Sequence, residues 1–136
     1  MRTIKGIVIH CTATVRDREY SISTIEEWHK HEGFAGIGYH YVVHLDGAIS
    51  KGRDLSQPGA HCKGQNLQTI GICYVGGLDY DHTFKDTRTP EQKRAMKRLI
   101  LGLAYRFEVE WIAGHNQFSN KACPCFDVKE EYGSLL

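Results

Sequence analysis

Two histidines and one cysteine have the residue types of a catalytic zinc site. His10 closes the apolar run GIVIHC, His115 directly follows the run WIAG, and Cys123 lies eight residues after His115. Polar residues that close buried strands project from a rigid sheet edge, where a metal site can be held to small tolerances. Two imidazoles and one thiolate suit Zn²⁺ and leave the fourth tetrahedral position open for water. For isolated residues, packed histidines and a buried inert thiol are the commoner explanation, so spacing alone leaves both interpretations open.

The charge balance of the chain argues against a nucleic-acid partner. Its 136 residues include 17 Lys and Arg and 16 Asp and Glu, for a formal net charge of +1. Nucleic acids select strongly basic surfaces, so no nucleic-acid partner is expected. No segment approaches the roughly 20 apolar residues that span a bilayer, and no membrane insertion is expected. The length predicts one domain over residues 1–136, with a monomer as the expected state.

The N-terminal segment and the cysteine count indicate a reducing compartment. The apolar stretch near the N-terminus is too short for the core of a secretion signal and runs directly into His10. Five cysteines cannot all pair with one another, which favours reduced thiols. We therefore expect a protein that is cytoplasmic when it is made.

Strand and helix signals alternate along the chain and predict an α/β domain. Short β-branched runs predict strands at residues 6–11, 39–45, 48–50, 69–75 and 108–113. Asp46-Gly47 predicts a tight turn that joins the second and third of these strands in a hairpin. Together with the intervening helices, these strands predict a single three-layer domain with a central mixed β-sheet of about five strands flanked by helices.

Capping signals mark the expected helices. Residues 23–26 have capping-box spacing, so a helix is expected to begin there, to turn Ile25 and Trp28 inward and to stop at Gly33. Thr89 is followed by Pro at the first helical position and by Gln three residues after the cap, which predicts a second helix running to about residue 107. A short third helix is expected after Pro124.

Five ordered segments resemble type 2 N-acetylmuramoyl-L-alanine amidases, a family that includes phage lysis enzymes and the peptidoglycan recognition proteins. These segments are VIHCTAT (8–14), GIGYHYVVHLDG (36–47), GAHCKGQN (59–66), TIGICYVGG (69–77) and AGHNQFSNKACPCFD (113–127). The resemblance covers nearly the whole chain. It implies an amidase-like fold, one Zn²⁺ per chain and cleavage of the bond between N-acetylmuramic acid and L-alanine in peptidoglycan.

The resemblance also implies roles for individual residues. His10, His115 and Cys123 stand at the positions of the zinc ligands, and Tyr39 and Lys121 stand at those of a catalytic pair. Zinc would polarise the amide carbonyl and activate water, a lysine cation would stabilise the oxyanion, and a tyrosine hydroxyl would orient water or protonate the leaving nitrogen. Without the family, a packed strand tyrosine and a solvated loop lysine would account for Tyr39 and Lys121.

Among the remaining histidines, one is a candidate substrate-binding residue and the others are expected to lie outside the site. His61, in GAHC, resembles a residue that lines the substrate groove of the family, with a surface-loop histidine as the alternative. His29 lies near an exposed helix end and is expected to be solvated, like its neighbour His31. Strand alternation predicts that His40 and His44 point to the face opposite Tyr39.

Two further cysteines offer alternative chemistry. Cys125 stands where the family pattern usually has a small residue after the proline, so it could compete with Cys123 for zinc or form a disulfide under oxidation. Cys123 is preferred because it stands at the family's ligand position. Cys11 could be the nucleophile of a cysteine hydrolase, but the zinc interpretation already uses the best-placed histidine, His10.

Three functions are therefore weighed. The first is a zinc-dependent amidase that acts on the cell wall after release, as a phage or prophage endolysin. The second is a non-catalytic peptidoglycan-binding module, which would not need Cys123, Tyr39 or Lys121. The third is an inhibitor of phage RNA polymerase, a role that some phage members of the family have. Only nine residues precede His10, a shorter N-terminal arm than this role suggests, so we do not expect it here.

Overall fold

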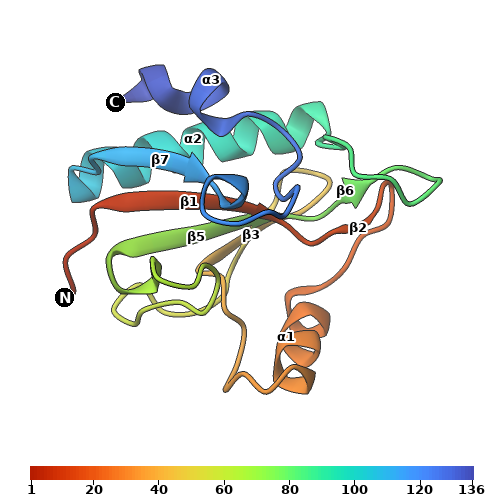
Figure 1. Ribbon diagram of the computed structural model, residues 1–136, viewed down its shortest axis with the longest axis horizontal. Helices are drawn as coiled ribbons and strands as arrows, with labels where there is room; N and C mark the ends of the chain where they lie inside the picture. The colour runs from red at the N-terminus through yellow and green to blue at the C-terminus, as the bar shows by residue number, and fades with distance from the viewer.

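Five strands form a central mixed sheet in the order β4-β3-β5-β1-β7 (Figure 1). The computed structural model describes residues 1–136, and its sheet consists of β1 (Gly6–Cys11), β3 (Tyr41–Val43), β4 (Ile49–Lys51), β5 (Thr69–Tyr74) and β7 (Trp111–Gly114). The pairs β1–β5, β1–β7 and β3–β5 are parallel, whereas β3 and β4 form the expected antiparallel hairpin. The predicted mixed sheet is confirmed.

Helices lie on both sides of this sheet. Helices α2 and α3 cover one side and α1 lies on the other (Figure 1). A two-stranded parallel sheet, β2–β6, lies at one end of the domain, and the chain runs from β2 to α1 (Figure 1). No helix is both long enough and apolar enough to cross a membrane. These elements are β2 (Thr14–Val15), β6 (Gly77–Leu78), α1 (Ile22–His31), α2 (Pro90–Phe107) and α3 (Val128–Tyr132), with 3-10 turns at Asn66–Gln68, His115–Gln117 and Gly133–Leu135.

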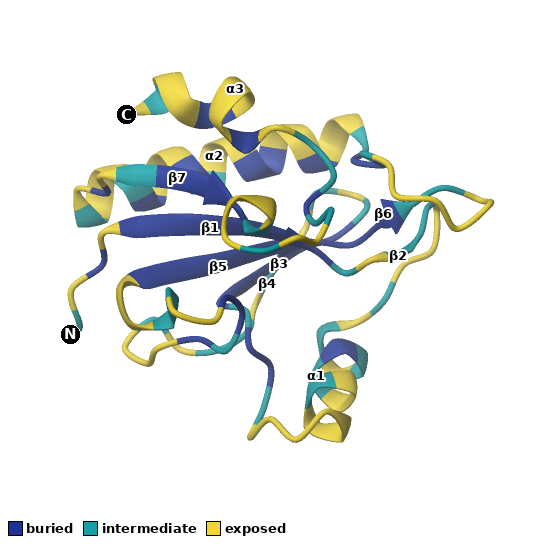
Figure 2. Ribbon diagram, viewed as in Figure 1, coloured by how far each residue is buried: buried dark blue, intermediate teal, exposed yellow.

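Alternation along the buried strands separates a packed face from a face that carries polar groups. In β1, Ile7 and Ile9 join the main apolar core beneath α2 and α3, whereas Val8 and His10 point to the other side. Every residue of β1 and β5 is buried (Figure 2). The polar side chain of His10 is therefore fixed by a strand that the core holds from behind.

Helix α2 begins at the capping box that the sequence predicts. The Thr89 hydroxyl accepts from the Gln92 amide N–H at 3.0 Å, and Gln92 Oε1 accepts from the Thr89 N–H at 2.9 Å. Gln92 is fully buried, and its Nε2 donates to the carbonyls of Val43 and Val75. One side chain thus caps the helix and joins it to the ends of two neighbouring strand segments.

Helix α1 differs from the sequence prediction at its start and in one side chain. It begins at Ile22, because the Ser21 hydroxyl accepts from the Thr24 N–H, so the N-cap lies two residues before the predicted one. Ile25 is buried as expected. Trp28 is 36% exposed and packs edge-on against Tyr20 at a ring-centroid distance of 4.9 Å, so its predicted inward position is wrong.

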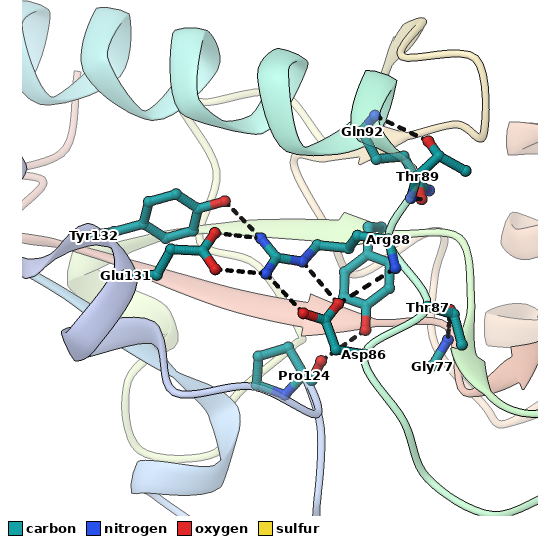
Figure 3. A network of polar contacts seen from close by, with 10 residues as sticks. Gly77, Asp86, Thr87, Arg88, Thr89, Gln92, Pro124, Glu131 and Tyr132 are labelled. Atoms are coloured by element: carbon teal, nitrogen blue, oxygen red, sulfur yellow. Dashed lines mark hydrogen bonds and ion pairs between the residues drawn. The ribbon is translucent and has the colours of Figure 1, made fainter.

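A buried arginine joins the segment before α2 to α3 (Figure 3). The Arg88 side chain is fully buried and donates two hydrogen bonds to Asp86, two to Glu131 and one to the Tyr132 hydroxyl. Its guanidinium also lies 3.5 Å from the ring centroid of Phe126. Every side of this buried cation therefore meets a charge, a hydroxyl or an aromatic face.

The Arg88 contacts fix the chain segment 123–127. Phe126 packs its ring face on the Arg88 guanidinium and lies edge to face with Tyr132 at a centroid distance of 6.0 Å. The buried Tyr74 hydroxyl on β5 donates to the Pro124 carbonyl at 2.7 Å (Figure 3). The sheet and the arginine thus hold Pro124 and Phe126, which flank Cys125 and directly follow Cys123.

Replacing Arg88 with Met should lower the free energy of unfolding by about 2–4 kcal/mol, because it leaves two half-exposed carboxylates without their cation. Hydrogen bonding to Arg88 lowers the pKa of Glu131, and the same contacts lower the pKa of Asp86 against the opposing effect of burial. This contribution is complete above about pH 5 and disappears as the pH falls through the lowered values. Urea unfolding at pH values from 7 to 3 measures this. Between pH 7 and pH 3, the free energy of unfolding should fall less in Arg88→Met than in the wild type. An equal fall in both proteins would contradict the stabilising role of the Arg88 ion pairs.

Candidate metal centre

The parallel register of β1 and β7 brings His10 and His115 together. Ile9 pairs with Gly114, so the residues that follow them lie side by side near the carboxyl edge of the sheet: His10 within β1, and His115 directly after the end of β7. Their ring centroids are 4.7 Å apart. His10 is buried and His115 is partly buried. The predicted convergence of the two histidines is present.

Cys123 completes a group of three potential metal ligands. One ring nitrogen of His10, one of His115 and the Cys123 Sγ all lie within 4.8 Å of one another. The sulfur lies 4.0 Å from His10 Nδ1 and accepts a hydrogen bond from the Cys11 backbone N–H at 3.1 Å. The backbone of the strand that carries His10 therefore also positions the cysteine.

The surroundings favour the protonation states that bind a metal. Interaction with the Cys11 side chain, followed by the neighbouring His10 and His115, lowers the pKa of the Cys123 thiol. Burial lowers the pKa of His10 and favours the neutral imidazole. Neutral imidazoles and a thiolate are the forms that bind zinc. By its donor atoms and their convergence, the site fits Zn²⁺ with one coordination position left for water or substrate.

The structure also separates Cys123 from the other two cysteines considered. Cys125 Sγ points away from the histidines and lies 3.9 Å from Cys11 Sγ and 3.4 Å from the Gly77 carbonyl. Cys11 is buried, and its hydrogen bonds with Cys123 and Cys125 raise the pKa of its thiol. A protonated, buried thiol is a poor nucleophile, which disfavours the cysteine-hydrolase alternative.

A cleft of about 350 Å³ opens over the three ligands. Tyr39, Lys121 and His61 all line it. Residues from α1 and the loop after it contribute to another part of the wall: Trp28, His29, Glu32 and Phe34. No sequence motif marks these four residues as part of a site, because only the position of α1 beside the sheet edge brings them there.

Tyr39 faces the metal-binding group. Its ring centroid lies 5.2 Å from that of His10. Burial, followed by the neighbouring Cys73, Cys123 and Cys11, raises the pKa of the Tyr39 phenol well above its usual value. Tyr39 therefore keeps its proton at neutral pH and can donate it.

His29 supports Tyr39, contrary to the prediction that it is solvated. The two ring centroids lie 5.0 Å apart, and His29 Nδ1 accepts from the Gly38 N–H at 2.8 Å. Phe34 also packs edge-on against the His29 ring, at a centroid distance of 5.4 Å. The Gly38 amide immediately before Tyr39 thus fixes this histidine, a contact that no periodic pattern in the sequence indicates.

His40 and His44 lie outside the cleft, but the alternation argument for His40 is wrong. Strand β3 begins only at Tyr41, so regular alternation does not extend back to Tyr39. The His40 ring lies 5.9 Å from His61, on the same side of the sheet as the metal-binding group. His44 instead contacts Ser50 and Glu19, away from the cleft.

The two candidate residues on loops differ in exposure. Lys121 is exposed, and its backbone N–H donates to the Ser119 hydroxyl at 3.2 Å. Its side chain is one of those that line the cleft. His61 is 8% exposed, and its Nδ1 lies 2.8 Å from His10 Nε2. Burial and the surrounding histidines lower the pKa of His61 to about 2.

Sequence relatives agree with the resemblance found in the motifs. The family model described as N-acetylmuramoyl-L-alanine amidase matches residues 1–126. The endolysin of Escherichia phage T7 is 37% identical over 124 residues, which cover 91% of this chain and 82% of that protein. The endolysin of Enterobacteria phage T3 is 36% identical over 127 residues, covering 93% and 84%.

A solved structure with the same fold gives independent support. The N-acetylmuramoyl-L-alanine amidase LysC from Clostridium intestinale superposes with a TM-score of 0.83 at 28% identity, covering 98% of this chain and 86% of that one. The peptidoglycan recognition protein SA of bumblebee shares the fold, with a TM-score of 0.79 at 22% identity over 100% of this chain and 84% of the other. The chain therefore belongs to the N-acetylmuramoyl-L-alanine amidase family.

Proposed function

We propose that the protein is a zinc-dependent amidase that hydrolyses the bond between N-acetylmuramic acid and L-alanine in bacterial peptidoglycan, as a phage or prophage endolysin. The observation that carries this proposal is the convergence of His10, His115 and Cys123 beneath a cleft that Tyr39 and Lys121 line. Two phage endolysins at 36–37% identity support the biological setting. A peptidoglycan recognition protein complex solved with tracheal cytotoxin supports a muropeptide ligand for this fold.

Zinc bound by these three ligands would supply a Lewis acid for the amide carbonyl and lower the pKa of coordinated water. The Tyr39 hydroxyl, which keeps its proton, would orient the attacking water or donate to the departing alanine nitrogen. Lys121 is an exposed loop residue that lines the cleft, and its cation would stabilise the charge that develops on the carbonyl oxygen.

The non-catalytic alternative accounts for fewer of the observations. A module that only binds peptidoglycan needs a cleft, but it does not need three metal-ligand atoms within 4.8 Å of one another. Nor does it need a protonated phenol beside them. Enzyme and binding module are separated by the reaction products.

Digestion of purified peptidoglycan should release new alanine amino groups without new sugar reducing ends, because the scissile bond is an amide. Reaction with a primary-amine reagent and a reducing-sugar assay on the same digest measure the two products. Reducing ends would indicate glycosidase chemistry, and neither product would indicate a binding module.

Purified protein should contain about one equivalent of zinc, and Cys123→Ser should lose metal and lytic activity together. Cys125→Ser is the matched control, because its sulfur points away from the histidines; it should keep both properties. Metal content measured by mass spectrometry beside a turbidity assay tests both variants. If Cys123→Ser kept the metal and Cys125→Ser lost it, Cys125 and not Cys123 would be the zinc ligand.

Tyr39→Phe and Lys121→Met should each lower kcat at unchanged zinc content, by about 10²–10⁴-fold for the tyrosine and about 10²–10³-fold for the lysine. Both changes remove a group that acts on the reacting atoms and leave the three metal ligands in place. Tyr105→Phe, at a side chain that is 90% exposed, serves as the control. Wild-type turnover in Tyr39→Phe would remove the tyrosine from the mechanism.

A further inference from the structure

His61 lies behind His10 and contacts the ring nitrogen that faces away from the cysteine. His10 Nδ1 is the nitrogen near Cys123 Sγ, at 4.0 Å, and His10 Nε2 lies 2.8 Å from His61 Nδ1. The two rings meet edge to face, with a centroid distance of 4.9 Å and an interplanar angle of 87°. Only one of these two nitrogens can carry the proton between them, so this contact ties the tautomer of one ring to that of the other.

A hydrogen-bond chain ending at a carbonyl fixes the direction of that contact. The Thr69 hydroxyl donates its single proton to the Gln65 carbonyl at 2.6 Å, so its oxygen accepts from His61 Nε2 at 3.3 Å. His61 Nδ1 is then unprotonated in the neutral ring and accepts from His10 Nε2–H. The remaining nitrogen of His10, Nδ1, consequently presents its lone pair toward Cys123.

A loop hydrogen bond and two glycines hold the His61 ring in place. Asn66 Oδ1 accepts from the backbone N–H groups of both His61 and Cys62, at 2.9 and 3.0 Å, and so holds the loop. A Cβ atom on Gly71 would lie 2.6 Å from the ring, and one on Gly59 would lie 2.4 Å from it. Only glycine at these two positions leaves room for the imidazole, which explains why it packs so closely on β5.

We propose that His61 is a positioning residue that holds His10 in the Nε2–H tautomer and so keeps the Nδ1 lone pair directed at the metal. The proposal rests on the zinc site of the proposed function, but the tautomer is a property of the metal-free protein as well. It gives His61 a role different from the muropeptide contact expected from the sequence, since both of its ring nitrogens already have partners inside the protein. Hydrogen-bonded partners of this kind orient a ligating histidine and raise its basicity.

The first test reads the tautomers directly. Nitrogen-15 NMR of the metal-free protein, with two-bond couplings to the ring protons, should show Nε2–H and unprotonated Nδ1 for both His10 and His61. Thr69→Val removes the hydroxyl acceptor and should populate the second tautomer of both rings. An Nδ1–H tautomer for His10 in the wild type would overturn the proposal, whether or not the protein proves to be an amidase.

The second test measures zinc affinity by competition with a chromogenic chelator. His61→Leu should weaken zinc binding by about 10–100-fold. His61→Asn, whose Oδ1 can occupy the place of Nδ1, should lie closer to the wild type than to His61→Leu. The exposed His31→Leu is the matched control and should bind as the wild type does.

The kinetic pattern separates this role from direct substrate contact. A positioning role predicts that zinc affinity and kcat fall together in His61→Leu, whereas a muropeptide contact predicts a higher KM at unchanged zinc affinity. The second pattern would overturn the proposal. If His61→Leu does not fold, the NMR of the wild type and of Thr69→Val decides the question.

Discussion

The parallel pairing of β1 with β7 is the constraint on which the candidate site depends. Their register makes His10 and His115 equivalent positions at one sheet edge, and it is set by apolar residues that alternate into the core, such as Ile7 beside Ile112. A slip of one residue would turn His10 into the core and Ile9 into the cleft. The metal-binding geometry is therefore as well defined as the core packing that holds the register.

The third ligand reaches this edge by a different route. Cys123 lies on a loop, and its position depends on a hydrogen bond from the Cys11 backbone, on the Tyr74 hydroxyl and on the aromatic and charged contacts of Arg88. These contacts come from β1, β5 and the segment before α2. A loop held from three elements can place a sulfur as accurately as a strand places an imidazole, which site geometry requires.

Much of the fold could be predicted from the sequence because its signals are local. Thr89 and Gln92 form the predicted capping box, and residues 6–11 form the predicted strand. The roles of His29, His40 and His61 could not be predicted in this way. Each depends on where an irregular segment meets its neighbour: the Gly38 amide at His29, the start of β3 only after His40, and the glycines at positions 59 and 71 around His61. Periodicity contains no information about such contacts.

Zinc K-edge X-ray absorption of the metal-loaded wild type tests the central claim most directly, because it counts the ligands by element. The structure predicts one sulfur at about 2.3 Å and two imidazole nitrogens at about 2.0–2.1 Å, with one further light atom from solvent. Two sulfurs would mean that Cys125 or Cys11 joins Cys123. A shell without sulfur, or with four protein ligands and no open position, would contradict a catalytic site built from His10, His115 and Cys123.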